Sequence, residues 1–227
     1  YAKSNEGPDI SIGDINNDGA QDIFVSGAKR QSAGLFLQGP AGAFSAAESD
    51  LFANDAINED TGHLFFDADS DGWNELLVIS GGNEFTDGPA LRPRLYRNNK
   101  GVLRKDTTAF TGFSLNASAV DSIDMDLDGD LDIFISSDAV SGAFGKTPQH
   151  GLFQNDGTGH FTDVTTERIP ELQTFGGIDD FSWADINADG LADLVVAGHW
   201  GPIAVFENTG SGWKYSADNG LDLSNGW

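Results

Sequence analysis

The sequence contains no cysteine and few basic residues. Its 227 residues include a single methionine, and 12 lysines and arginines stand against 36 aspartates and glutamates, which gives a formal net charge of −24. The absence of cysteine excludes disulfide bonds and thiol catalysis. Such an acidic chain is not suited to nucleic acid, whose phosphates require basic patches. It also disfavours adsorption to anionic membranes.

Long apolar runs are missing as well. No stretch approaches the roughly 20 apolar residues that a membrane-spanning helix needs, so we expect no membrane insertion. No signal peptide is visible, and the chain opens on Tyr1 instead of Met, which favours a mature or trimmed piece. Helical periodicity is almost absent. Instead, short runs rich in Val, Ile, Leu and Phe alternate with Gly, Asn and Asp, as is typical of β-proteins.

One acidic pattern of nine residues occurs four times. Its clearest copy is Asp124-Met-Asp-Leu-Asp-Gly-Asp-Leu-Asp132, with acids at positions 1, 3, 5 and 9, Gly129 at position 6, and an apolar run directly after it. The other copies begin at Asp14, Asp67 and Asp185, so that the four starts lie 53, 57 and 61 residues apart. Repetition at this period predicts a repeat architecture.

The pattern is suited to calcium, a hard cation that takes roughly 6 to 8 oxygen ligands. Side chains at positions 1, 3, 5 and 9 and the backbone carbonyl at position 7 could supply these oxygens, while glycine at position 6 permits a sharp turn. The predicted ligands in the four copies are Asp14, Asn16, Asp18, Ala20 and Asp22; Asp67, Asp69, Asp71, Trp73 and Glu75; Asp124, Asp126, Asp128, Asp130 and Asp132; and Asp185, Asn187, Asp189, Leu191 and Asp193.

Two alternatives to this interpretation start from the same residues. An EF-hand loop would carry Glu at position 12, but the four copies have Val25, Val78, Ile135 and Val196 there, within β-rich runs, so the loops join strands. A hairpin turn rich in Asp, Asn and Gly would need no metal. However, clustered carboxylates repel one another unless a cation is present. We therefore predict up to four Ca²⁺ ions and consider Mg²⁺ less suitable, because it demands octahedral geometry and retains water.

A second signature accompanies the acidic loops. The segment Leu152–Phe161 reads Leu-x-x-Asn-x-Gly-x-Gly-x-Phe, and weaker versions lie at Leu95–Asn98 and Val205–Asn208. Together the two signatures resemble the FG-GAP/VCBS repeats, the calcium-loop repeats also seen in integrin α-subunit propellers and in bacterial proteins with an ASPIC/UnbV-type tail. The resemblance covers nearly the whole chain. It implies a β-propeller with a calcium loop between strands A and B of each blade.

We therefore predict an all-β fold, a β-propeller or part of one, as a single region over residues 1–227. Its four-stranded blades are expected at about 8–50, 61–107, 118–165 and 178–216, with 217–227 leading into a further blade or tail. Three arrangements remain open: part of a larger propeller of about seven or eight blades, a closed four-bladed ring, or copies that associate through open blade edges. Partners are expected on the face opposite the calcium loops, where the longer connections gather.

Catalytic signatures are not visible. There is no Gly-x-Ser-x-Gly or His-Glu-x-x-His motif. The acid pairs Glu59-Asp60 and Asp179-Asp180 are interpreted as solvated connectors, because neighbouring side chains of an extended segment point in opposite directions. We expect the protein not to be an enzyme.

The function expected from the sequence is a secreted or bacterial cell-surface interaction, adhesion or assembly module in which calcium is structural. Outside cells, calcium reaches the millimolar levels at which extracellular modules bind it. The ligand would be a protein or a glycan. One alternative is a glycan-binding lectin, in which Trp73, Trp183 or Trp200 could stack on sugars. Another is the scaffold of a polysaccharide-degrading enzyme.

Overall fold

The computed structural model describes residues 9–47, 50–143, 145–198, 203–217 and 220–221. These residues form four antiparallel sheets, each with four strands hydrogen-bonded in chain order. The sheets are β1 (Ile10–Gly13), β2 (Asp22–Val25), β3 (Gly34–Gln38) and β4 (Phe44–Ala46); β5 (Asp60–Phe66), β6 (Glu75–Ser80), β7 (Arg94–Asn99) and β8 (Val102–Asp106); β9 (Ala117–Ile123), β10 (Asp132–Ser137), β11 (Gly151–Asn155) and β12 (Phe161–Asp163); and β13 (Asp180–Ala184), β14 (Asp193–Ala197), β15 (Ala204–Asn208) and β16 (Trp213–Tyr215).

Short helices occupy several of the connections. They are η1 (Pro40–Gly42), α1 (Asp50–Ala53), η2 (Pro89–Leu91), α2 (Thr165–Arg168) and η3 (Pro170–Gln173). Among the described residues, none of the helices is long and apolar enough to cross a membrane.

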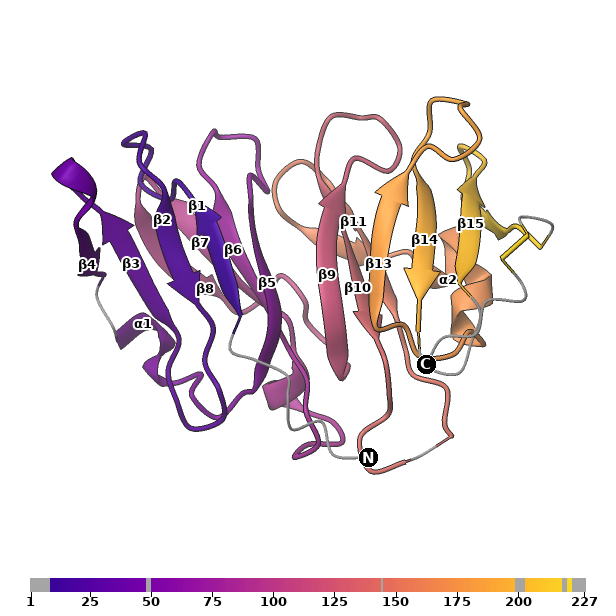
Figure 1. Ribbon diagram of the computed structural model, residues 1–227, viewed down its shortest axis with the longest axis horizontal. Coiled ribbons are helices and arrows are strands. Elements are labelled where there is room, and N and C mark those ends of the chain that lie inside the picture. The colour runs from indigo at the N-terminus through magenta and orange to yellow at the C-terminus, as the bar shows by residue number, and fades with distance from the viewer. Residues whose placement is uncertain (1–8, 48–49, 144, 199–202, 218–219, 222–227) are drawn as a thin grey trace.

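The four sheets stand side by side as the blades of a β-propeller, which confirms the predicted fold class (Figure 1). The first strand of each blade contacts the first strand of the next, β1 with β5, β5 with β9, and β9 with β13. In Figure 1 the first and fourth blades lie at opposite ends of the row. Within the described residues the blades thus form an open row, and the closed four-bladed ring was a wrong alternative.

Three apolar cores lie between successive blades. In an inner blade, the second strand contributes side chains to the cores on both sides of the sheet. In β6, Leu76 belongs to the core shared with the first blade, whereas the next residue, Leu77, belongs to the core shared with the third. Ile133 and Phe134 of β10 divide in the same way between the second and fourth blades. All four side chains are fully buried. This follows from the alternation of side chains along a strand, and it explains why these strands are continuous apolar runs.

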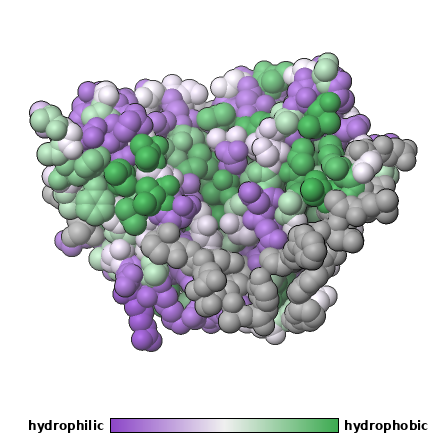
Figure 2. All heavy atoms as spheres, in the orientation of Figure 1, coloured by the Kyte–Doolittle hydropathy of each residue, from purple (hydrophilic) through white to green (hydrophobic). Residues whose placement is uncertain are grey.

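Among the described residues, no further blade packs on the outer face of the first blade. Ile12 pairs with Ile23 and Ile23 pairs with Phe36, so these side chains share one face of the sheet. Ile10 and Ile12 are 59% and 64% exposed there, and Phe44 on the same face is 46% exposed. Figure 2 shows apolar surface in this left part of the molecule. An apolar sheet face of this kind is a candidate contact surface.

The acidic nine-residue segments form the turns between the first and second strands of each blade. All four turns lie along the upper edge in Figure 1, whereas the longer connections lie along the lower edge. Position 9 of each segment is the first residue of the second strand: Asp22, Glu75, Asp132 and Asp193.

Candidate metal centres

The four acidic loops have one repeated backbone conformation. Position 6 is glycine with φ between 85° and 98°, and position 4 is a non-glycine residue with φ between 53° and 61°. The position 4 residues are Asn17, Ser70, Leu127 and Ala188. The left-handed conformation costs about 1–2 kcal/mol for a residue with a side chain. Because the loops accept this cost at the same place four times, the loop shape is imposed by contacts within the loop.

Those contacts are hydrogen bonds from loop amides to the acidic side chains. In the second loop, Asp67 accepts from the N–H groups of Asp71 (3.2 Å) and Gly72 (2.8 Å), one on each carboxylate oxygen. Asp71 in turn accepts from the N–H of Trp73 at 2.9 Å. The first and fourth loops repeat this arrangement. The loop's own amides thereby orient the acids at positions 1 and 5.

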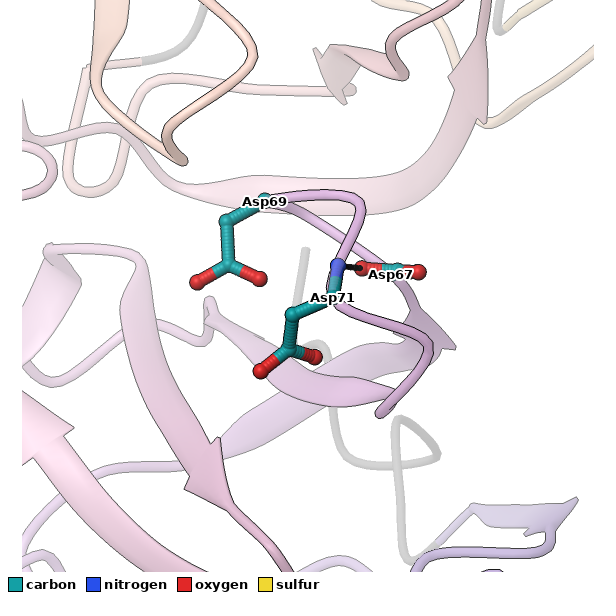
Figure 3. Close-up of side chains that lie close together, drawn as sticks. All are labelled: Asp67, Asp69 and Asp71. Carbon is teal, nitrogen blue, oxygen red and sulfur yellow. Dashed lines mark hydrogen bonds between the residues drawn. The ribbon is translucent and has the colours of Figure 1, made fainter.

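The carboxylates at positions 1, 3 and 5 converge in the second and third loops. Asp67, Asp69 and Asp71 each place one carboxylate oxygen so that all three lie within 4.8 Å of one another (Figure 3). The third loop does the same, through Asp124, Asp126 and Asp128. In the first and fourth loops, Asn16 and Asn187 stand at position 3, and the side-chain oxygen of each accepts the N–H of position 5.

Several of these oxygens lack a partner. The Oδ1 atoms of Asp69, Asp124, Asp126 and Asp130 are buried and accept no hydrogen bond from the part of the chain that the structure describes. An ionised oxygen without a partner is costly to bury, by several kcal/mol. A cation among them would supply the missing interaction, and a site made only of oxygen donors matches the hard-cation preference of calcium. The residues present therefore fit a calcium ion.

The raised pKa values of several loop acids also indicate that the site lacks a positive charge. Burial, followed by the charge of Asp71, raises the pKa of Asp69. Burial, followed by the charge of Asp128, raises the pKa of Asp126. Burial and contact with Asp128 also raise the pKa of Asp130 to about 6. Without a cation, part of this negative charge is relieved by protons instead.

The acids at position 9 have a further structural role. Glu75 is fully buried, and its two carboxylate oxygens accept the backbone N–H groups of Ala68 (2.7 Å) and Asn98 (3.1 Å). Equivalent pairs of bonds are made by Asp22, Asp132 and Asp193. Burial raises the pKa of Glu75 and that of Asp132, the latter to about 7. Position 9 therefore ties the loop to the third strand, and its role as a metal ligand stays a prediction.

Position 7 is the remaining predicted ligand position. The N–H of Ala20, Trp73, Asp130 and Leu191 donates to the side chain at position 5. This holds the peptide next to the carboxylate cluster, and coordination by the position 7 carbonyl stays a prediction.

Sequence reasoning missed two arginines beside the loops. Arg97 Nη1 lies 3.7 Å from Asp69, and Arg168 Nη2 lies 3.6 Å from Asp126. Both accompany loops that carry aspartate at position 3. The guanidinium groups offset part of the extra charge of these loops. Because the arginines lie far from the loops in sequence, nothing in the nine-residue pattern points to them.

Two other candidate residues, Asp60 and Trp183, are placed in blade contacts outside the acidic loops. Asp60 was predicted to be a solvated connector residue, which is wrong: it is 3% exposed in β5, forms an ion pair with Arg94 and accepts the N–H of Gly27 at 3.0 Å. Trp183 packs edge-on against Phe134 in the core between the third and fourth blades. Trp200 lies outside the described residues.

The opposite face contains an open cavity of about 250 Å³. It lies between the long connections of the second and third blades, and polar lining residues include Thr86, Ser114, Ser141, Thr147 and Gln149. No charged side chain is among the described residues that line it. Hydroxyl and amide groups without charge are suited to a neutral, hydrogen-bonding ligand.

Two solved structures share this fold. One is an Agrocybe aegerita lectin described for specific recognition of non-reducing terminal N-acetylglucosamine, with a TM-score of 0.58 and 18% identity over 96% of this chain and 54% of that chain. The other is a chain of the crystal structure of BBS1N in complex with ARL6DN, soaked with lead, with a TM-score of 0.51 and 13% identity over 94% and 56%. This chain spans about half the length of either. At such identities, the similarity shows the fold alone.

The sequence itself matches a known family over most of its length. No curated protein matches it. The FG-GAP-like repeat, however, is found three times, at residues 14–78, 67–135 and 140–196. The first two matches each span two successive acidic loops, and the third spans the fourth loop together with strands of the third and fourth blades, in agreement with the repeat observed in the fold. The chain therefore belongs to the FG-GAP-like repeat family.

Proposed function

We propose that the four loops bind calcium, up to one ion each, and that the protein is a non-enzymatic interaction module stabilised by these ions. The observation that carries the proposal is the convergence of Asp67, Asp69 and Asp71, which leaves the buried Asp69 Oδ1 without a partner. Calcium would supply the positive charge that the cluster lacks. The chain's own amides already hold the carboxylates in place for it.

Calcium bound in this way is structural. An ion that binds only the folded protein stabilises it by about 2.7 kcal/mol at a free concentration of 100 Kd. Four such sites would exceed the stability of many small domains, so folding would follow calcium supply. We accordingly place the protein outside the cell, secreted or at a bacterial surface, where calcium is abundant.

The test is a thermal melt in calcium and in chelator. Calcium is expected to raise the melting temperature of the wild type strongly, and Asp71→Ala and Asp128→Ala should each remove part of the rise. Asp50→Ala, at an exposed position outside the loops, is the matched control. Equal melting temperatures in calcium and chelator would overturn the proposal.

A glycan is the candidate ligand that the opposite face favours. The uncharged cavity between the long connections offers hydroxyl and amide groups, and the lectin with the same fold is described as recognising a terminal sugar. We expect retention on an array of neutral glycans that is weakened by Gln149→Ala and unaffected by Gln173→Ala, an exposed glutamine elsewhere. An array without retention would favour a protein ligand.

Self-association is the second candidate function, favoured by the exposed apolar face of the first blade. Ile10, Ile12 and Phe44 lie on this face at 46–64% exposure. If the face joins copies, the mass in solution exceeds that of one chain and Ile12→Lys restores the monomer. A wild-type monomer at high concentration would exclude this function for the isolated chain.

A further inference from the structure

One asparagine side chain connects the first metal loop to the second. Asn98 Nδ2 donates to the carbonyl of Ile15 (2.8 Å), which is position 2 of the first loop. The same nitrogen donates to the carbonyl of Asn74 (2.9 Å), which is position 8 of the second loop. Asn98 Oδ1 accepts the N–H of Gly101 at 2.7 Å. Both the nitrogen and the oxygen of the side-chain amide are therefore hydrogen-bonded. The side chain bridges two loops that belong to different blades.

The next pair of loops is connected in the same way. Asn155 Nδ2 donates to the carbonyl of Ala68 (2.8 Å), position 2 of the second loop, and to the carbonyl of Leu131 (3.1 Å), position 8 of the third. Asn155 Oδ1 accepts the N–H of Gly159 at 3.0 Å. Asn98 and Asn155 are 5% and 3% exposed, so water does not compete for these bonds. The repetition shows that the bridge belongs to the blade-to-blade contact.

The position 9 acids complete a continuous chain of hydrogen bonds. The N–H of Asn98 donates to Glu75, whose other oxygen accepts the N–H of Ala68. The carbonyl of Ala68 accepts from Asn155, and the N–H of Asn155 donates to Asp132. Counted from the first loop, the chain runs through Asp22, Ile15, Asn98, Glu75, Ala68, Asn155, Asp132 and Met125.

The place at which this chain enters each loop matters for metal binding. Position 2 lies between the ligands at positions 1 and 3, so the orientation of its peptide groups sets where both side chains point. In the second loop, that residue is Ala68, whose N–H is held by Glu75 of its own blade and whose carbonyl is held by Asn155 of the next. Ordering one loop therefore orders the asparagine that holds position 8 of the following loop.

On the basis of the proposed calcium binding, we propose that Asn98 and Asn155 are positioning residues that couple neighbouring loops, so that calcium in one loop raises the calcium affinity of the next. Calcium binding to the first loop carries the entropic cost of restraining the shared asparagine. Calcium then binds the second loop at a site that is already more restrained. Coupling between the first two loops has an additional support, because Asn17 Nδ2 donates to the carbonyl of Gly72 at 2.8 Å.

The coupling can be measured loop by loop through the position 6 glycines. The N–H of Gly72 donates to Asp67, so its ¹⁵N NMR signal reports calcium in the second loop. The calcium midpoint is the calcium concentration at which half of the change in this signal has occurred. It is compared in the wild type, in Asp18→Ala, in Asn98→Ala and in the double variant. Asp18→Ala disables the first loop. Asn99→Ala, at the neighbouring exposed position, is the matched control.

Disabling the first loop is expected to raise the calcium concentration at the Gly72 midpoint about fivefold or more. This factor is at the lower end of typical coupling between sites. In the Asn98→Ala background, the same change should have a clearly smaller effect, whereas Asn99→Ala should leave it intact. Disabling the fourth loop with Asp189→Ala, two blades away, should not shift Gly72. An unchanged Gly72 midpoint in Asp18→Ala would overturn the coupling.

A reciprocal measurement avoids reliance on the asparagine variant, should that variant unfold. Asp71→Ala must weaken the midpoint at Gly19 in the first loop by the same factor, because coupling between binding sites is reciprocal. Four glycine signals that respond to calcium with independent midpoints would overturn the coupling but support calcium binding. Glycine signals that do not respond to calcium at all would overturn both.

Discussion

The side-chain amide of Asn155 donates a hydrogen bond to the backbone carbonyl of Ala68, which lies 87 residues earlier and in the preceding blade. The same nitrogen also binds the carbonyl of Leu131. The asparagine of the Leu-x-x-Asn signature thus serves the contact between blades as well as its own hairpin. Loss of this side chain should therefore lower the stability of the whole row of blades.

We predict that Asn155→Ala destabilises the protein by about 2–4 kcal/mol. It removes two buried donors and leaves the carbonyls of Ala68 and Leu131 unpaired, and each unsatisfied buried group costs about 1–3 kcal/mol. Urea unfolding in excess calcium measures the effect, with exposed Asn99→Ala as control. A loss equal to that of the control would show that the bridge contributes nothing.

Arg168 should weaken calcium binding in the third loop. Its guanidinium lies 3.6 Å from the Asp126 carboxylate, so it repels a cation bound there. We predict that Arg168→Gln raises the calcium affinity of this loop a fewfold at low ionic strength and less at high salt. Titration monitored at the Gly129 amide measures this. Arg104→Gln, at an exposed position on β8, is the control and should change nothing.

Acid should destabilise the protein through His150. His150 is 5% exposed, its Nδ1 accepts the N–H of Ser137 (3.2 Å), and its Nε2 donates to the carbonyl of Gly176 (3.1 Å). Burial lowers the pKa of His150 from 6.5 to about 4, so the folded state keeps the ring neutral while the unfolded chain protonates. Stability from this group is complete above about pH 6.5 and is lost as pH falls towards 4.

The His150 contribution amounts to about 2 kcal/mol between pH 6.5 and 5, at about 1.4 kcal/mol per pH unit. Unfolding free energies at pH 7.5 and 5.0 for the wild type and for His150→Asn measure it. The wild type should lose more stability than the variant over this interval. Equal losses would show that the ring is protonated in the folded protein.

Two adjacent glycines should differ sharply in their tolerance of alanine. A Cβ at Gly177 would lie 1.9 Å from the carbonyl oxygen of Asp138, whereas a Cβ at Gly176 would meet nothing within 4 Å. Gly177→Ala must therefore displace the backbone, and we expect a cost of about 1–3 kcal/mol or more. Thermal unfolding of the two variants measures this. Equal melting temperatures would contradict the close approach of these segments.

Much of the fold could be predicted because its signals are local and repeated. The acids at positions 1, 3 and 5, the glycine at position 6 and the apolar run after position 9 lie within about a dozen residues, so their spacing is visible without the structure. Leu77 and Ile133 lie in continuous apolar runs, as strands buried on both faces do.

The connections between blades could not be predicted in the same way. The bond between Asn98 and Ile15 joins residues 83 positions apart, and a repeat pattern does not specify which blade contacts which carbonyl. Leu127 at φ 61° was also unexpected, because intrinsic preference disfavours this conformation and loop hydrogen bonds override it. The recurrence of asparagine at residues 98, 155 and 208 was the available signal, since a fixed polar residue at a strand end usually has a partner.

Whether the four loops are calcium sites is decided by counting the calcium ions that each chain binds. Chelated protein is titrated with calcium and its mass is measured under native conditions, alongside Asp71→Ala. We predict specific uptake that saturates at up to four ions per chain, with one ion fewer for Asp71→Ala. Absence of specific uptake, or equal uptake by the variant, would contradict the assignment of these loops as calcium sites.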